Sequence, residues 1–280
     1  MACDLHIHST ASDGGFDPVE MVEHASSIGL TCISLTDHDT MTGVSEARKR
    51  AEELDLPFIS GIEITCVQDE QEIHLLGYFL DPGHPLILKH QKEARQFTIG
   101  RLTEIVEKLR RIGKMIEIER VIEIAGEGSL GRPHVARALV EGGYAATFQD
   151  AFDRYIGSEG PAFAPPKGKH PGEIYQLIEE AGGISSIAHP GLLGRAEMMD
   201  DNYIMEHREW GAKAIEVFHP RHDDYMVSYY MNLAHKFNMG ITGGSDCHGP
   251  FYSDILMDRK FVPNWVAEKL EKLYRLQRCE

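Results

Sequence analysis

The sequence predicts an α/β fold in which a mostly parallel sheet or barrel is interrupted by a helical segment. Short β-rich runs alternate with helical patterns over about the first 80 residues, and the alternation resumes near residue 173. Strand signals fade between these two stretches. Alternating strands and helices are typical of a parallel sheet or barrel. The length of 280 residues suits one large barrel.

The N-terminal part contains four predicted strands and two predicted helices. Asp17 in the N-cap position and Pro18 at the first helical position favour the start of the first helix. The other boundaries follow from β-branched runs and from helical spacing of apolar residues. The predicted strands are residues 4–8, 31–36, 58–65 and 72–79, and the predicted helices are residues 18–28 and 43–54.

Helical spacing dominates the middle of the chain, which we interpret as a helical insertion subdomain. Apolar residues recur there at Ile105, Leu109 and Ile112, as on one face of a helix. A stretch rich in proline, glycine and lysine, residues 161–172, resembles a linker at its end. The expected domains are a metal-binding barrel of residues 1–83 and 169–280 and an insertion of residues 84–168.

After the insertion, strands and helices alternate again. The pair Gly182-Gly183 favours the end of the first of these helices. The last segment has the spacing of an amphipathic closing helix. The whole chain is therefore expected to contain about seven strands with interleaved helices. In this part the predicted strands are residues 184–188, 214–218 and 239–242, and the predicted helices are residues 173–181, 203–210, 224–237 and 262–278.

Composition restricts the classes of partner. The net charge is −16, from 28 basic and 44 acidic residues, which disfavours coating of duplex DNA. No window reaches the roughly 18 apolar residues of a membrane span, and no signal peptide is evident. The five cysteines are odd in number and lack a C-x-x-C pair, which fits a reducing compartment. We therefore expect a cytoplasmic protein with no membrane partner. A small phosphorylated ligand is still compatible with the acidic charge, because bound divalent cations can dominate the local field at a site.

Histidine is frequent, with fifteen copies, and its placement points to metal chemistry. His6 and His8 are two residues apart in a predicted strand, so both side chains lie on the same face. Asp246 and His248 repeat this spacing just after another predicted strand. Because the C-terminal ends of parallel barrel strands meet at one mouth, these residues are expected to converge.

Other histidines and carboxylates lie in or near further strands and loops. A single histidine beside a strand is more often a hydrogen-bonded core residue than a ligand, but two such pairs are harder to explain that way. The candidate ligands outnumber the four to six coordination positions of one ion, so we expect two to three divalent ions. Manganese is preferred, and iron or zinc is possible. The candidate ligands are His6, His8, Asp13, His38, Glu63, His74, His189, Asp246 and His248.

Several neighbouring residues allow more than one interpretation. Asp37 and Asp39 flank His38, and either orient it or cap the following turn. His219 follows a predicted strand, where it can be a ligand, a substrate contact or neither; we list it as a candidate substrate contact. The other histidines lie in helical or loop contexts and are expected to be solvated, namely His24, His84, His90, His170, His207, His222 and His235.

Five short motifs occur in a fixed order and together resemble the PHP (polymerase and histidinol phosphatase) family. The resemblance spans nearly the whole chain outside the insertion. It implies a distorted (β/α)7 barrel and a trinuclear metal centre built from the nine candidate ligands. The motifs are Asp4-Leu5-His6-Ile7-His8-Ser9, Thr36-Asp37-His38-Asp39, Gly61-Ile62-Glu63, Ala188-His189-Pro190 and Gly244-Ser245-Asp246-Cys247-His248.

The resemblance also indicates a branch of the family. Histidinol-phosphatase-like members tend to have histidine at the position of Asp13. Aspartate there, together with the insertion, resembles the branch of nucleoside 3',5'-bisphosphate phosphatases and 5'-3' exoribonucleases. Arg132 and His134 of the insertion are then candidate substrate contacts, because arginine grips phosphate and a helix N-terminus favours anions. Alternatively Arg132 forms an ion pair between domains, and Arg195 is a weaker candidate.

The expected reaction is hydrolysis of nucleotide phosphate esters by a metal-bound hydroxide, on 3',5'-bisphosphonucleotides or short 5'-phosphorylated oligoribonucleotides. Asp246 and His248 are the candidate catalytic residues for proton transfer. Three alternatives stay open: a histidinol-phosphate or other small-monoester phosphatase, a non-catalytic metal-stabilised PHP module, and an amidohydrolase-like C–N hydrolase. Asp13 and the insertion disfavour the first, the complete ligand set disfavours the second, and the lack of a strand-end lysine disfavours the third.

Overall fold

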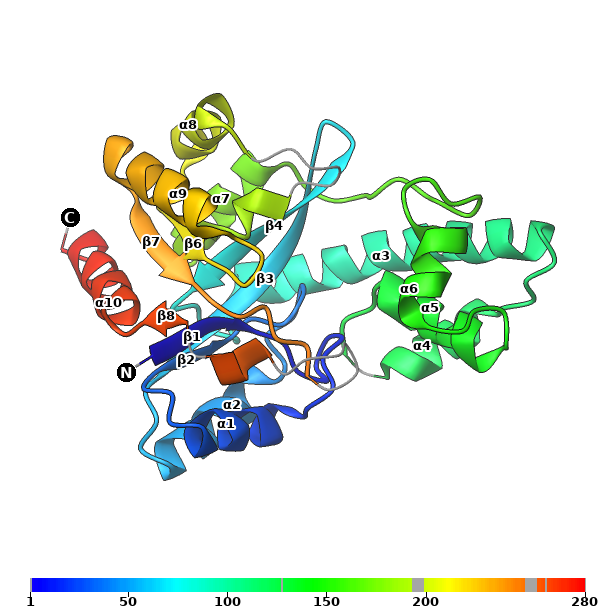
Figure 1. Cartoon of the computed structure of the whole chain (residues 1–280), viewed down its shortest axis with the longest axis horizontal. Coiled ribbons are helices and arrows are strands. Elements are labelled where there is room, and N and C mark those ends of the chain that lie inside the picture. The colour runs from blue at the N-terminus through cyan, green and yellow to red at the C-terminus, as the bar shows by residue number, and fades with distance from the viewer. Residues whose placement is uncertain (1, 127, 193–198, 250–255, 260, 280) are drawn as a thin grey trace.

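The computed structural model describes residues 2–126, 128–192, 199–249, 256–259 and 261–279. Its strands form one eight-stranded sheet in the order β7-β6-β5-β4-β3-β2-β1-β8, which curls into a nearly closed barrel (Figure 1). The predicted fold class is therefore confirmed. The strands are β1 (Ala2–Ile7), β2 (Ile33–Leu35), β3 (Phe58–Gln68), β4 (Gln71–Tyr78), β5 (Ile184–Ile187), β6 (Ala214–Phe218), β7 (Gly240–Gly243) and β8 (Val262–Pro263).

Strand directions depart from a purely parallel barrel at two places. β8 runs antiparallel to β1, and β4 runs antiparallel to both β3 and β5, whereas the other neighbours are parallel. A two-residue turn of Asp69 and Glu70 joins β3 to β4, and both residues have positive φ values of 49° and 61°. Such a turn matches the twist of a hairpin. β4 therefore presents His74 from its middle rather than from its C-terminal end.

The chain after β7 returns to β1 and brings the two ends of the sheet together. The amide of His8 donates to the carbonyl of Cys247 at 3.0 Å, and the amide of Asp246 donates to the carbonyl of His6 at 2.8 Å. Gly244 permits this approach, because a Cβ atom there would lie 2.2 Å from the Cβ atom of His6. Closure of the barrel thus places the Asp246–His248 pair beside the His6–His8 pair.

Helices cover both sides of the barrel (Figure 1). Asp17 caps the first helix as predicted and forms a capping box with Glu20. The predicted closing helix begins three residues late, at Trp265, because Val262 and Pro263 pair with β1 as β8. No described helix combines the length and apolar character needed to cross a bilayer. The helices are α1 (Pro18–Ser27), α2 (Val44–Glu53), α7 (Pro171–Glu180), α8 (Asp201–Trp210), α9 (Asp224–Lys236) and α10 (Trp265–Gln277).

The middle segment is helical and extends away from the barrel (Figure 1). Its buried apolar residues, among them Leu109 and Leu139, form a cluster separate from those of the barrel. Lys169 forms an isolated parallel β-bridge with Cys66 of β3, so part of the expected linker runs along the barrel. The proposed domain boundaries stay a prediction. The helices are α3 (Pro85–Arg111), α4 (Ile118–Ala125), α5 (Arg132–Glu141) and α6 (Phe148–Ala151), followed by a π-helical turn at Phe152–Ile156.

Two leucines of α3 test how much this second cluster stabilises the segment. Leu109 is fully buried, whereas Leu88 is 53% exposed. We predict that Leu109→Ala lowers the free energy of unfolding by about 2–5 kcal/mol, because it leaves a cavity. Leu88→Ala should change it by less than about 0.5 kcal/mol. Chemical denaturation followed by circular dichroism measures both, and equal effects of the two substitutions would contradict the assignment.

Candidate metal centre and substrate cleft

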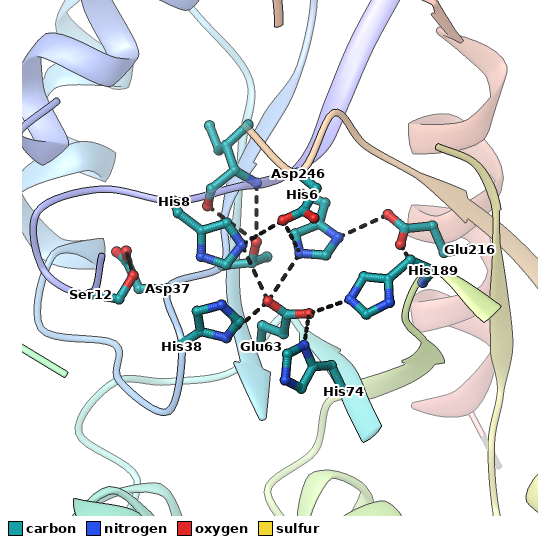
Figure 2. Close-up of polar contacts among 12 residues, drawn as sticks. His6, His8, Ser12, Asp37, His38, Glu63, His74, His189, Glu216 and Asp246 are labelled. Carbon is teal, nitrogen blue, oxygen red and sulfur yellow. Dashed lines mark hydrogen bonds and ion pairs between the residues drawn. The ribbon is translucent and has the colours of Figure 1, made fainter. Parts of the chain in front are cut away.

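The buried carboxylate of Glu63 in β3 lies at the centre of the site (Figure 2). Its side chain is fully shielded from solvent. Five histidine rings surround its two oxygens, and they come from β1, β4 and the segments that follow β1, β2 and β5. The Oε2 atom lies 3.2 Å from His6 Nε2, 3.2 Å from His8 Nε2 and 3.1 Å from His38 Nδ1, and the Oε1 atom lies 3.1 Å from His74 Nδ1 and 3.0 Å from His189 Nε2.

The carboxylate of Asp246 forms a second centre next to Glu63. Its Oδ1 atom lies 3.2 Å from His8 Nε2 and 3.5 Å from His6 Nε2, and its Oδ2 atom lies 3.5 Å from His219 Nε2. Asp246 and His189 both have positive φ values, of 52° and 26°. Non-glycine residues rarely adopt such backbone conformations, which are concentrated at functional sites.

Asp13 and His248 extend the cluster toward the loop that follows β1 and is here called the β1 loop (residues 8–17). His248 Nε2 lies 3.4 Å from Asp13 Oδ1, and the His248 ring stacks on that of His8 at 4.2 Å between centroids. The structure thus brings all nine candidate ligands together. Three groups have ligand atoms within 4.8 Å of one another: His8, Asp13, His38 and His248; His6, His8, Glu63 and Asp246; and His38, Glu63 and His74.

The donor set fits divalent cations. Within the described part of the chain, several buried atoms make no hydrogen bond, including His6 Nε2, both ring nitrogens of His8 and Glu63 Oε2. Buried polar atoms are normally hydrogen-bonded, so this group of unpaired nitrogen and oxygen atoms at one point favours bound cations. Imidazole nitrogen and carboxylate oxygen together suit manganese, iron or zinc.

Charge inside the cluster is balanced between carboxylates and imidazoles. Burial alone raises the pKa of the Glu63 and Asp246 carboxyl groups, but the surrounding histidines bring both pKa values well below the usual range. Burial lowers the pKa of His8, yet Asp246 and Glu63 raise it to about 10. Both carboxylates are therefore ionised at neutral pH and require positive charge nearby. Cations and protons therefore compete for the carboxylate oxygens and ring nitrogens of the cluster.

Glu216 is a buried carboxylate that the sequence analysis missed. Its Oε1 atom lies 3.0 Å from His6 Nδ1, and its Oε2 atom accepts a hydrogen bond from the amide of His189 at 2.7 Å. It therefore orients the His6 ring so that Nε2 faces Glu63, as carboxylates do behind metal-bound histidines. The sequence signal for it was one charged residue in the middle of the otherwise apolar strand β6.

Asp37 and Asp39 support the loops rather than His38. Asp37 accepts a hydrogen bond from the amide of Ser9 at 2.7 Å. It also accepts one from the hydroxyl of Ser12 at 2.6 Å, and Figure 2 shows these two side chains together. Asp39 accepts one from the amide of Thr65 at 2.9 Å. The described contacts therefore favour a role in holding the β1 loop and β3 near the site.

Three histidines that we expected to be solvated are buried, so that expectation was wrong for them. His90, His207 and His222 are 3%, 0% and 7% exposed. His207 lies between the hydroxyl of Tyr175 at 2.6 Å and Gln68 Oε1 at 3.0 Å. Packing of helices against the barrel covers these rings, which helical context alone does not reveal.

A cleft of about 660 Å³ adjoins the metal cluster between β4 and the helical segment, and His74, His189 and Arg132 all line it. Arg132 Nη2 lies 3.1 Å from Glu72 Oε1, so it forms the ion pair that we considered as an alternative while still facing the cleft. Arg195 lies outside the described residues.

The other two candidate substrate contacts have clear neighbours. His134 lines a smaller cavity with Asp13, and its Nδ1 atom accepts a hydrogen bond from the amide of Gly131 at 3.1 Å. His219 is 4% exposed and lies against Asp246. Its position therefore resembles that of the candidate ligands more than that of a residue on the cleft wall.

Glu216 provides a test of the metal centre. We predict that Glu216→Gln lowers divalent-metal affinity about 10- to 100-fold, because the His6 ring loses its ionic partner. Calorimetric titration with Mn²⁺ measures the affinity. Glu209→Gln, on the exposed part of α8, serves as the control. Unchanged affinity in the Glu216 variant would show that this carboxylate does not orient a ligand.

Comparison with known proteins agrees with this geometry. The PHP domain family matches residues 4–158. A 5'-3' exoribonuclease of Haemophilus influenzae is 32% identical, over 88% of this chain and 90% of the relative. A 3',5'-nucleoside bisphosphate phosphatase of Chromobacterium violaceum is 29% identical, over 88% and 87%. A solved structure from Bifidobacterium adolescentis, described as a metal-dependent phosphoesterase, is 26% identical, with a TM-score of 0.85 and coverage of 97% and 96%. The chain therefore belongs to the PHP domain family.

Proposed function

We propose that this chain is a metal-dependent phosphoesterase that hydrolyses phosphate esters of nucleotides. Its substrates are 3',5'-bisphosphonucleotides or the 5'-phosphorylated ends of short oligoribonucleotides. The observation that carries this proposal is the arrangement of five histidines around Glu63, next to a cleft that Arg132 lines. The names of the relatives from Haemophilus influenzae and Chromobacterium violaceum support the choice of nucleotide substrates.

The proposed cofactor is a set of two to three divalent cations, with manganese preferred over iron or zinc. Glu63 and Asp246 each approach several ring nitrogens and would therefore be among the residues that hold the cations. When bound, such cations acidify water and offset the negative charge of the phosphate. The remaining candidate ligands are His6, His8, Asp13, His38, His74, His189 and His248.

Hydrolysis adds the hydroxyl group of water to phosphorus, breaks the P–O ester bond and delivers a proton to the leaving oxygen. Asp246 and His248 are proposed for the proton transfers because their side chains are 25% and 16% exposed, whereas His8 and Glu63 are fully buried. The low pKa of the Asp246 carboxyl keeps it ionised, so His248 is the better proton donor of the two. Arg132 and His134 are proposed to contact the substrate.

The proposed surroundings of the enzyme follow from charge and cysteine content. A net charge of −16 favours a small phosphorylated substrate over duplex DNA or an anionic membrane surface. All five cysteines are free thiols, and four of them are buried, which supports a cytoplasmic location.

The proposed function is tested with manganese-loaded protein on three substrates: adenosine 3',5'-bisphosphate, a short 5'-phosphorylated RNA and histidinol phosphate. We expect turnover of the first or second and little turnover of the third. His8→Ala should lower the amount of bound metal and should lower turnover about 100-fold or more. The reason is that Glu63 and Asp246 both lose the His8 ring, which lies between them. His235→Ala, on the exposed part of α9, is the control.

Two of the alternatives give distinct results in this assay. Preferred turnover of histidinol phosphate would favour a small-monoester phosphatase. Metal binding with a rise in melting temperature but no turnover of any ester would favour a non-catalytic module. An unchanged His8→Ala variant would refute the metal centre itself.

A further inference from the structure

The candidate ligand His38 follows β2, and the chain around it runs beside β3. The His38 ring faces Glu63, with Nδ1 at 3.1 Å from Oε2 (Figure 2). The two residues form an isolated parallel β-bridge, and the amide of Asp39 donates to the carbonyl of Glu63 at 2.7 Å. Asp39 has a positive φ of 52°, a conformation that persists in a non-glycine residue only when its neighbours hold it. The direction of the His38 ring therefore depends on what holds residues 39–41.

The first turns of helix α3 hold this segment. Gln91 Oε1 accepts hydrogen bonds from the amide of Met41 at 3.0 Å and from the hydroxyl of Thr40 at 3.1 Å. Met41 is 1% exposed, so its amide is left buried and unpaired if Gln91 is replaced by an apolar residue, which is unfavourable. These contacts need only an acceptor oxygen on the side chain at position 91.

His90, next to Gln91 in α3, lies against the carboxylate of Asp39. Its Nε2 atom lies 3.5 Å from Asp39 Oδ1, and the residue is 3% exposed. Neither ring nitrogen makes a hydrogen bond to any residue that the structure describes. Buried polar atoms are normally paired, so the Asp39 carboxylate is the natural partner of Nε2. Because Asp39 Oδ1 also accepts from the amide of Thr65 at 2.9 Å, one carboxylate joins α3 to β3.

α3 is a firm support for these contacts, because it is packed in both parts of the molecule. It extends from the barrel into the helical segment (Figure 1). Ile87 belongs to an apolar cluster of the barrel, whereas Leu102 belongs to the cluster of the helical segment. The part of α3 that carries His90 and Gln91 lies between these two anchors, so it restricts residues 39–41 more than a loop would.

Resting on the proposed function, we infer that His90 and Gln91 are positioning residues for the metal centre. They hold residues 39–41 and so keep the His38 ring directed at its cation site, without touching a cation or the substrate themselves. His38 belongs to two of the three ligand groups described above, so its displacement weakens only part of the centre. The group without His38 consists of His6, His8, Glu63 and Asp246.

Gln91→Leu tests the hydrogen bonds to residues 39–41, and Gln91→Glu is the conservative variant because it keeps an acceptor oxygen. The readouts are the number of manganese ions retained after dialysis and their affinities in calorimetric titration. We expect Gln91→Leu to retain fewer ions than wild type and to bind the lost ions at least about 10-fold more weakly. Gln91→Glu should restore most of this loss.

Gln277→Leu is the matched control. Gln277 is also half-buried, and it donates from helix α10 to the carbonyl of Gly183 at 3.1 Å. Gly183 precedes β5, whereas the candidate ligand His189 follows it, so this bond lies at the end of β5 away from the metal centre. The number and affinity of bound ions should be unchanged in this variant.

His90→Phe tests the contact with Asp39, because phenylalanine fills the place of the ring without a nitrogen. The assay follows turnover of adenosine 3',5'-bisphosphate while the manganese concentration is varied. We expect the manganese concentration for half-maximal turnover to rise about 10-fold. KM for the substrate should change less than about 2-fold, because His90 does not contact it. His90→Gln keeps an N–H donor and should restore part of the loss.

The outcomes separate this inference from the proposed function. A wild-type protein that neither binds manganese nor hydrolyses any phosphate ester would refute the proposed function. If the wild type does both, unchanged metal binding in Gln91→Leu and His90→Phe would refute the inference alone. An equal weakening of every bound ion that Gln91→Glu does not reverse would also refute it, because that result indicates general destabilisation. If His90→Phe fails to fold, the two Gln91 variants decide the question.

Discussion

Burial of the Glu63 carboxylate imposes the strongest constraint on this structure. An ion removed from water costs several kcal/mol unless its surroundings compensate. Here the compensation comes from five imidazole rings at 3.0 to 3.2 Å, contributed by separate parts of the barrel. Neutral rings alone do not supply positive charge, so the cluster needs either protons on the histidines or bound cations. This requirement links the fold directly to metal-dependent chemistry.

The barrel meets this constraint through local departures from regular geometry. β4 reverses direction, so that His74 approaches Glu63 from the middle of a strand. Gly244 lets the chain after β7 touch the backbone of His6, and Asp246 adopts a positive φ of 52° to face the same point. The left-handed backbone conformation of Asp246 is strained, and the contacts of its carboxylate with the histidines offset that strain. The same arrangement leaves Asp246 and His248 at the solvent-facing side of the cluster.

Sequence reasoning predicted much of this centre because strand periodicity is a strong signal. His6 and His8 are spaced at i and i+2, as are Asp246 and His248. This spacing places the two side chains of a pair on one face, and parallel strand ends bring both pairs to one mouth of the barrel. The direction of β4 was not predictable, because the turn residues Asp69 and Glu70 lack the glycine or asparagine typical of a tight hairpin. Glu216 was missed because one charge in an apolar strand does not identify its partner. Burial of His207 depends on helix packing, which periodicity does not describe.

Anomalous diffraction from manganese-loaded crystals locates the ions themselves and so decides whether Glu63 and Asp246 hold them. We expect two or three peaks among the nine candidate ligands, with the Glu63 and Asp246 carboxylates next to them. A single peak, or peaks away from Glu63, would contradict this expectation.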